Sequence, residues 1–127
     1  MLFTLAPKRS GEIATAVDDG RVAVCLPFLL EAGYSARDGR DHADLFAELL
    51  ALPYLEIDQA VERRAADVQG QLARAGHHRL PPVDIIVAAI AERHGHDILH
   101  YDADFDLMLE RTDLEYGSVW LAERGAL

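Results

Sequence analysis

The chain lacks several features on which common protein classes depend. It has one cysteine, Cys25, which excludes an internal disulfide and a thiolate metal cage, and the apolar neighbours of Cys25 predict a buried thiol. No apolar run approaches the roughly 20 residues that span a bilayer, and the apolar start is too short for a signal peptide. The glycines form neither a GxGxxG pattern nor a P-loop, and no nucleophile elbow is present. We therefore expect a soluble cytoplasmic protein with no membrane contact.

Positive charge is also scarce. Lys and Arg together number 12 against 22 Asp and Glu, so the formal net charge is -10. This balance excludes a broad basic face for nucleic acid, and any such contact must be local, with metal ions offsetting the acids. Half of the 127 residues are hydrophobic. Length and composition together predict one folded domain over residues 1–127.

Helices and short strands alternate along the chain. Hydrophobic periodicity, capping residues, Gly and Pro predict helices over residues 11–19, 28–36, 41–52, 59–75 and 83–94, and a turn leading into a short helix over residues 102–111. Short apolar or alternating runs predict strands over residues 21–26, 54–57, 97–100 and 118–121. The helix over 83–94 is apolar on nearly every side, so we expect it at the centre of the domain. The pattern predicts an α/β fold with a parallel sheet between helices.

Carboxylates gather where these elements begin and end. Asp84 opens the apolar helix, Asp102, Asp104 and Asp106 directly follow a strand, and Glu31 follows another strand. In parallel sheets, ligands gather at the carboxyl ends of the strands. The helix dipole should keep Asp84 ionised.

Acids held this close together repel one another, and a divalent cation removes the conflict. Two unit charges about 4 Å apart interact by roughly 4 kcal/mol at an effective dielectric of about 20. As an alternative, Asp102, Asp104 and Asp106 are turn and capping residues, and Glu31 lies half exposed on a helix face. His77 and His78 form a polar loop in which solvated side chains are more common than metal ligands. The residues alone leave these alternatives open.

The order of these features resembles the PIN-domain family, and within it the VapC-type toxins of toxin–antitoxin pairs. The most specific stretches are Pro-Val-Asp-Ile-Ile-Val-Ala-Ala at 82–89 and Asp-Ile-Leu-His-Tyr-Asp-Ala-Asp-Phe-Asp at 97–106. Residues 30–37, Leu-Glu-Ala-Gly-Tyr-Ser-Ala-Arg, are similar to the family's glutamate-bearing helix. The similarity runs from about residue 11 to the C-terminus. It implies a three-layer α/β/α domain with a short, mainly parallel central sheet.

The resemblance also implies a function and a site. PIN domains of this type are Mg²⁺- or Mn²⁺-dependent endoribonucleases, and their acids come from separated parts of the chain. Glu31, Asp84 and Asp102 match the family's acidic positions and are the implied catalytic residues, with Asp104 as an adjoining acid. The implied role of all four is to hold one or two divalent ions.

The resemblance further implies an RNA substrate, a cognate antitoxin and a homodimer. Arg37, Arg40 and Arg79 are candidates for RNA contact, although solvation or pairing with the excess acids is the more common role of such residues. A basic residue of the partner could enter the acidic site. The apolar faces of helices 28–36 and 41–52 would serve an antitoxin segment or a second copy, and core packing is the alternative use.

The beginning of the chain departs from the family pattern. Family members start with an apolar strand that ends in Asp, whereas here Leu5 is followed by Ala6, Pro7 and Lys8. Asp18 and Asp19 lie beyond the first predicted helix and are poor substitutes. We expect a first strand that is altered or missing, explained by a misplaced start, a degraded gene, or a fold kept without nuclease activity. Two hypotheses follow: a toxin ribonuclease with weakened metal binding, and a catalytically inactive PIN-like module that binds an antitoxin or an active relative.

Overall fold

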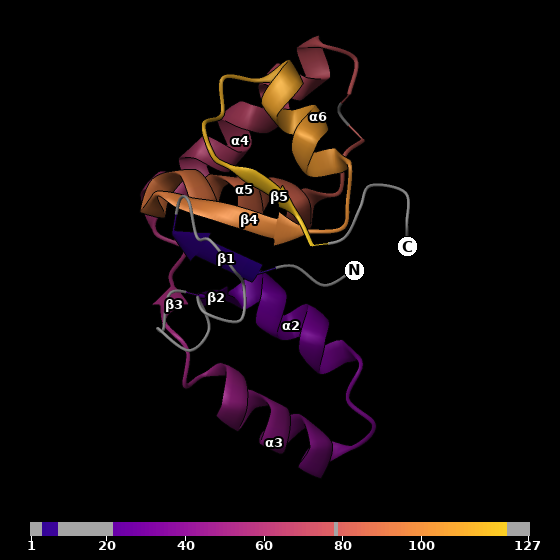
Figure 1. The fold of residues 1–127 in the computed structure, drawn as a ribbon. Helices are drawn as coiled ribbons and strands as arrows, with labels where there is room; N and C mark the ends of the chain where they lie inside the picture. Colours follow the sequence, from indigo (N-terminus) through magenta and orange to yellow (C-terminus); the bar gives the residue numbers. More distant parts are fainter. Residues whose placement is uncertain (1–3, 8–21, 78, 122–127) are drawn as a thin grey trace.

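The computed structural model describes residues 4–7, 22–77 and 79–121 of the chain (Figure 1). Its elements are β1 (Thr4–Pro7), β2 (Val24–Cys25), α2 (Leu26–Tyr34), α3 (Gly39–Leu49), β3 (Tyr54–Leu55), α4 (Gln59–Arg74), α5 (Pro82–His94), β4 (His96–His100), α6 (Asp104–Arg111) and β5 (Ser118–Trp120). From residue 22 onward, each predicted helix and strand is present with shifted ends. The predicted helix over 11–19 lies outside the described residues. An α/β fold is confirmed, and the single-domain organisation stays a prediction.

The strands form two small sheets. One has the order β1-β4-β5 and the other pairs β2 with β3. The β4–β5 and β2–β3 pairs are parallel, with Leu99 opposite Val119 and Cys25 opposite Leu55. β1 runs antiparallel to β4, with Leu5 opposite Ile98. Most of these pairings are therefore parallel, as predicted, and the pairing of β1 with β4 is the antiparallel exception. The direction of a four-residue strand is not encoded in its own apolar pattern, because it depends on the partner strand it meets.

Helix α5 forms the centre of the core, as its all-round apolar sequence predicts. Its residues 85 and 87–91 are buried, and Pro82 stands in its first turn. Gly95 ends the helix in the left-handed conformation, with φ 69°, which favours glycine. The helix packs on α4 and β4, and Figure 1 shows it behind β4 and β5. The position of α5 therefore determines where the side chain of Asp84, in its first turn, is placed.

Helix α4 is capped at its first turn and is held against α5 by an apolar stripe and an ion pair. The Asp58 side chain accepts a hydrogen bond from the amide of Val61 at 2.8 Å. The apolar stripe of α4 buries Val61, Val68 and Leu72. Arg64 Nε donates to Glu92 of α5 at 2.7 Å. The two helices therefore form one packed unit.

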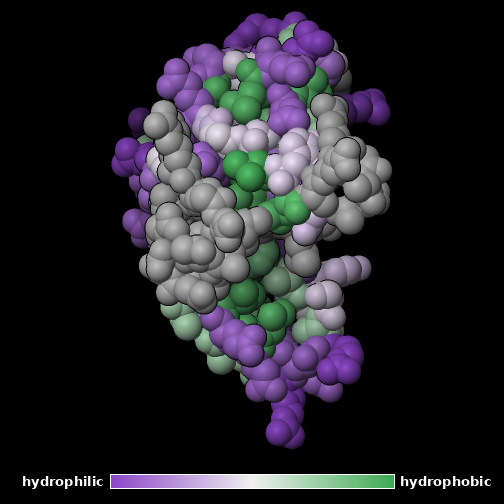
Figure 2. Space-filling model, in the orientation of Figure 1, coloured by the Kyte–Doolittle hydropathy of each residue, from purple (hydrophilic) through white to green (hydrophobic). Residues whose placement is uncertain are grey.

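Helices α2 and α3 form a more exposed arm. No residue of α3 is buried, and α3 packs on α2. Gly33 allows this approach, since a Cβ there would come within 3.0 Å of His42 and Phe46. Figure 2 shows hydrophobic residues over the region between the two helices and hydrophilic residues at the far end of α3. Cys25, just before α2, is fully buried as predicted, and burial raises the pKa of its thiol to about 11.

Candidate metal centre

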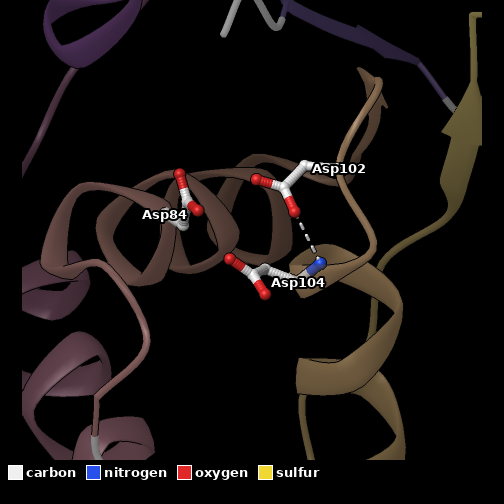
Figure 3. A group of neighbouring side chains, drawn as sticks. All are labelled: Asp84, Asp102 and Asp104. Atoms are coloured by element: carbon white, nitrogen blue, oxygen red, sulfur yellow. Dashed lines mark hydrogen bonds between the residues drawn. The ribbon is translucent and has the colours of Figure 1, made fainter. Parts of the chain in front are cut away.

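Three carboxylates from two parts of the chain lie close together (Figure 3). Asp84 lies in the first turn of α5, Asp102 follows β4, and Asp104 is the first residue of α6. One oxygen from each lies within 4.8 Å of the others. The structure thus brings together three of the four acids that the sequence singled out for a metal. Their role as ligands stays a prediction.

Asp84 is the most constrained member of this group, which we call the acidic cluster. It is 2% exposed, and its Oδ2 has no hydrogen-bond partner among the described residues. Burial, followed by the charges of Asp102, Asp104 and Glu31, raises the pKa of Asp84 to about 7. The helix dipole favours an ionised Asp84, and burial and like charges act against it.

The donor set fits a hard divalent cation. Mg²⁺ and Mn²⁺ prefer oxygen ligands, and a cation would supply the partner that Asp84 Oδ2 lacks among the described residues. It would also offset the mutual repulsion of the three carboxylates. The donor chemistry of the cluster therefore suits a divalent cation.

Asp102 and Asp104 are linked through the backbone. The amide of Asp104 donates to Asp102 Oδ1 at 2.9 Å, and the amide of Asp102 donates to Nδ1 of His100 at 3.0 Å. Asp102 therefore serves the turn, as the capping alternative proposed, while also belonging to the acidic cluster. Burial and then the charge of Asp102 raise the pKa of Asp104.

Asp106 is turned away from the cluster. Its Oδ1 accepts from Ser118 Oγ and its Oδ2 accepts from Trp120 Nε1 at 2.9 Å. Oγ of Ser118 in turn lies 2.6 Å from Nε2 of His100, which is fully buried. Burial lowers the pKa of His100, and the charges of Asp106 and Asp102 act in the opposite direction. Sequence reasoning missed His100 and Ser118. A histidine at the end of an apolar strand was the available signal.

Glu31 reaches the same region from α2 but does not join the compact group. It lines a hollow of about 720 Å³ together with Asp84 and Asp102. The remaining walls, which make this the apolar hollow, are Leu26, Pro27, Leu30, Tyr34, Ile57, Pro81, Val83 and Ile86. Of the four predicted acids, Asp84 and Asp102 therefore belong both to the acidic cluster and to the lining of the apolar hollow, whereas Glu31 belongs to the lining alone.

A second hollow, of about 450 Å³, lies on the Asp104 side. His77 and Arg79 line it with Asp104, and we call it the polar hollow. His77 does not belong to the acidic cluster, and His78 lies outside the described residues. Arg37 forms an ion pair with Asp41 at 3.5 Å, so it takes the alternative role of pairing with one of the excess acids. Arg40 lies in the first turn of α3. Of the three candidate arginines, Arg79 is the one placed beside an acid of the cluster.

None of the helices in the described part of the chain is both long and apolar enough to cross a membrane.

Comparison with known proteins identifies the class that this fold and acidic cluster represent. The PIN domain family model matches residues 3–108, so the chain belongs to the PIN-domain family. It is 37% identical over 99 residues to VapC ribonuclease Mb1587 of Mycobacterium bovis, covering 77% of this chain and 74% of the relative. Ribonuclease VapC11 of Mycobacterium tuberculosis is similar to the same extent. A solved structure of DNA-bound VapBC from Salmonella typhimurium matches with a TM-score of 0.68 over 86% of this chain and 82% of that chain. At 18% identity this match supports the fold.

Proposed function

We propose that the chain is a metal-dependent endoribonuclease of the toxin–antitoxin type, with Mg²⁺ or Mn²⁺ held by Asp84, Asp102 and Asp104. Two observations on Asp84 support this proposal: its buried Oδ2 has no hydrogen-bond partner among the described residues, and one of its carboxylate oxygens lies within 4.8 Å of an oxygen of Asp102 and of Asp104. The similarity to relatives named VapC ribonucleases supports the reaction. Glu31, on the apolar side, completes the predicted acid set.

The chemistry divides between the chain and the ion. When bound, a divalent cation supplies positive charge to an RNA phosphate and lowers the pKa of a water molecule for attack on phosphorus. The three carboxylates hold that charge in place. Asp84 must lose its proton for this role, which a nearby cation favours.

RNA approaches from the polar hollow in this proposal. Arg79 is exposed there beside Asp104 and can contact a phosphate oxygen. With a net charge of -10, the chain repels RNA elsewhere, so the contact is local. We place this reaction in the cytoplasm.

The apolar hollow suits a protein partner. Leu30 is 60% exposed and Tyr34 93% exposed on its α2 wall, while Glu31, Asp84 and Asp102 supply negative charge. An antitoxin segment with apolar residues and one basic residue would match both parts. A homodimer is a further expectation, and the exposed arm of α2 and α3 is the surface available to it.

A second candidate function rests on the sequence of β1. Thr4, Leu5, Ala6 and Pro7 include no carboxylate, where the family pattern expects an Asp. A chain without that ligand would keep the apolar hollow for a protein partner and lose turnover.

Cleavage of RNA by purified protein in Mn²⁺ tests the first candidate. We expect slow cleavage by the unaltered chain, at least about 100-fold slower for Asp84→Ala, and unchanged for Asp44→Ala on the exposed face of α3. Equal cleavage by the chain and its Asp84→Ala variant would contradict the proposal. No cleavage by either, together with binding to the small protein encoded by the neighbouring gene, would favour the second candidate.

A further inference from the structure

A chain of partly buried hydrogen bonds lies next to the acidic cluster. It runs from the amide of Asp102 to Nδ1 of His100 at 3.0 Å, and from Nε2 of His100 to Ser118 Oγ at 2.6 Å. Ser118 Oγ continues to Asp106 Oδ1, and Trp120 Nε1 donates to Asp106 Oδ2. The participants come from β4, α6 and β5. The network therefore connects three elements to one backbone amide of the cluster.

The direction of every bond in this network is fixed. A backbone amide can only donate, so Nδ1 of His100 accepts and carries no proton. The ring is then neutral, with its proton on Nε2, and it donates to Ser118 Oγ. The hydroxyl proton of Ser118 is left to donate to Asp106, whose carboxylate accepts at both oxygens. Each donor has one acceptor.

The imidazole ring has little freedom to turn. His100 is fully buried, and its ring lies 4.9 Å from that of Phe105 and 5.0 Å from that of Trp120, measured between centroids. A ring held by packing on two sides and by hydrogen bonds at both nitrogens presents Nδ1 at one fixed position. The Asp102 amide is held at that position.

We propose that His100, Ser118 and Asp106 are positioning residues that orient Asp102 toward Asp84 and Asp104. Holding the amide of Asp102 fixes the turn after β4, and the same turn is closed by Asp102 Oδ1 accepting from the amide of Asp104. The network therefore sets two of the three carboxylates in the acidic cluster. This inference rests on the proposed function only in taking those carboxylates as holders of the ion.

Mn²⁺ affinity, measured by electron paramagnetic resonance, separates positioning from simple stabilisation. We expect Ser118→Ala and His100→Leu to weaken Mn²⁺ binding about 10-fold or more, the usual cost of losing a group that orients a ligand. His100→Asn should recover most of this loss, because its side-chain oxygen can replace Nδ1 as the acceptor for Asp102.

The matched control is Thr112→Ala. Thr112 Oγ1 donates to the carbonyl of Met108 at 2.6 Å, so this variant also loses a partly buried hydroxyl hydrogen bond at the end of α6, away from the cluster. We expect its Mn²⁺ affinity to equal that of the unaltered chain. Thermal unfolding of each variant allows affinities to be compared at the same folded fraction.

A metal-free measurement tests the network itself. Long-range ¹H–¹⁵N NMR should place the His100 ring proton on Nε2. Amide exchange at Asp102 should accelerate about 10-fold or more in His100→Leu, with little change in Thr112→Ala. If His100→Leu fails to fold, Ser118→Ala is followed by the same spectra and should alter the Nε2 signal.

The outcomes distinguish this inference from the proposed function. Absence of Mn²⁺ binding in the unaltered chain, with the proton on Nε2 and a protected Asp102 amide, would contradict the function and support the network. Mn²⁺ binding that Ser118→Ala and His100→Leu leave as strong as Thr112→Ala would overturn the positioning role. A ring proton on Nδ1 would overturn it as well.

Discussion

The region around α5 and the arm formed by α2 and α3 differ in how deeply their side chains are buried. Helix α5 is buried over most of its length, and its first turn carries Asp84 into the acidic cluster. In α3 no residue is buried, and Leu30 and Tyr34 of α2 are exposed. The carboxylates proposed to hold the ion thus lie beside the buried core, while the surface proposed for a partner lies on the arm. The difference predicts that changes in the two regions separate stability from binding.

The largest difference is expected for core truncation. Ile90→Ala in α5, where the side chain is fully buried, should lower the free energy of unfolding by about 2–5 kcal/mol. Leu50→Ala, at the end of α3 and 55% exposed, should change it by less than about 1 kcal/mol. Urea unfolding followed by circular dichroism measures both. Equal losses would show that the arm belongs to the core.

Replacing Asp84 with Asn should change how stability depends on pH. The pKa of Asp84 rises from 3.8 to about 7 in the folded chain, so folding favours its protonated form. This stabilisation is fully present below pH about 4 and is lost as pH rises through about 7, by on the order of 2–4 kcal/mol. In metal-free urea unfolding at several pH values, Asp84→Asn should lack this loss.

Two controls sharpen the pH experiment. Asp44→Asn, on the exposed arm, should keep the pH dependence of the unaltered chain. Mn²⁺ should restore stability near pH 8 in the unaltered chain, because a bound cation favours the ionised carboxylate. A pH dependence that survives in Asp84→Asn would locate its source elsewhere.

The smallest effect on stability is expected on the wall of the apolar hollow. Leu30→Ser should change the free energy of unfolding by less than about 0.5 kcal/mol, because the side chain is 60% exposed. It should nevertheless weaken binding of the neighbouring gene's product about 10-fold or more, through lost apolar contact. Ala73→Ser, at an exposed position of α4 outside the arm, is the matched control. Unchanged binding of the partner to Leu30→Ser would show that the apolar hollow is not part of the partner-binding surface.

The sequence predicted the elements from residue 22 onward and three acids of the cluster, because each depends on a local signal. Pro82 and Gly95 bound α5, and the apolar stretch after Asp84 reveals its burial. Helical geometry also explains Asp106: two residues after Asp104 in the same helix, it must point to a different side.

Other features depend on contacts between distant residues and were not predictable from local pattern. The antiparallel direction of β1 arises from its pairing with β4, and the link from His100 to Ser118 joins residues 18 apart in the chain. The raised pKa of Asp84 depends on burial and on three other acids, which a sequence does not position. The proposed need for a carboxylate in β1 came from the family resemblance rather than from the residues themselves.

A titration of metal-free protein with Mn²⁺, run on the unaltered chain and on Asp84→Asn, tests the central claim most directly. The account predicts saturable binding to the unaltered chain, weakened because β1 carries no carboxylate, and loss of that binding in Asp84→Asn. Identical titration curves for the two proteins would contradict the assignment of the acidic cluster as the metal site.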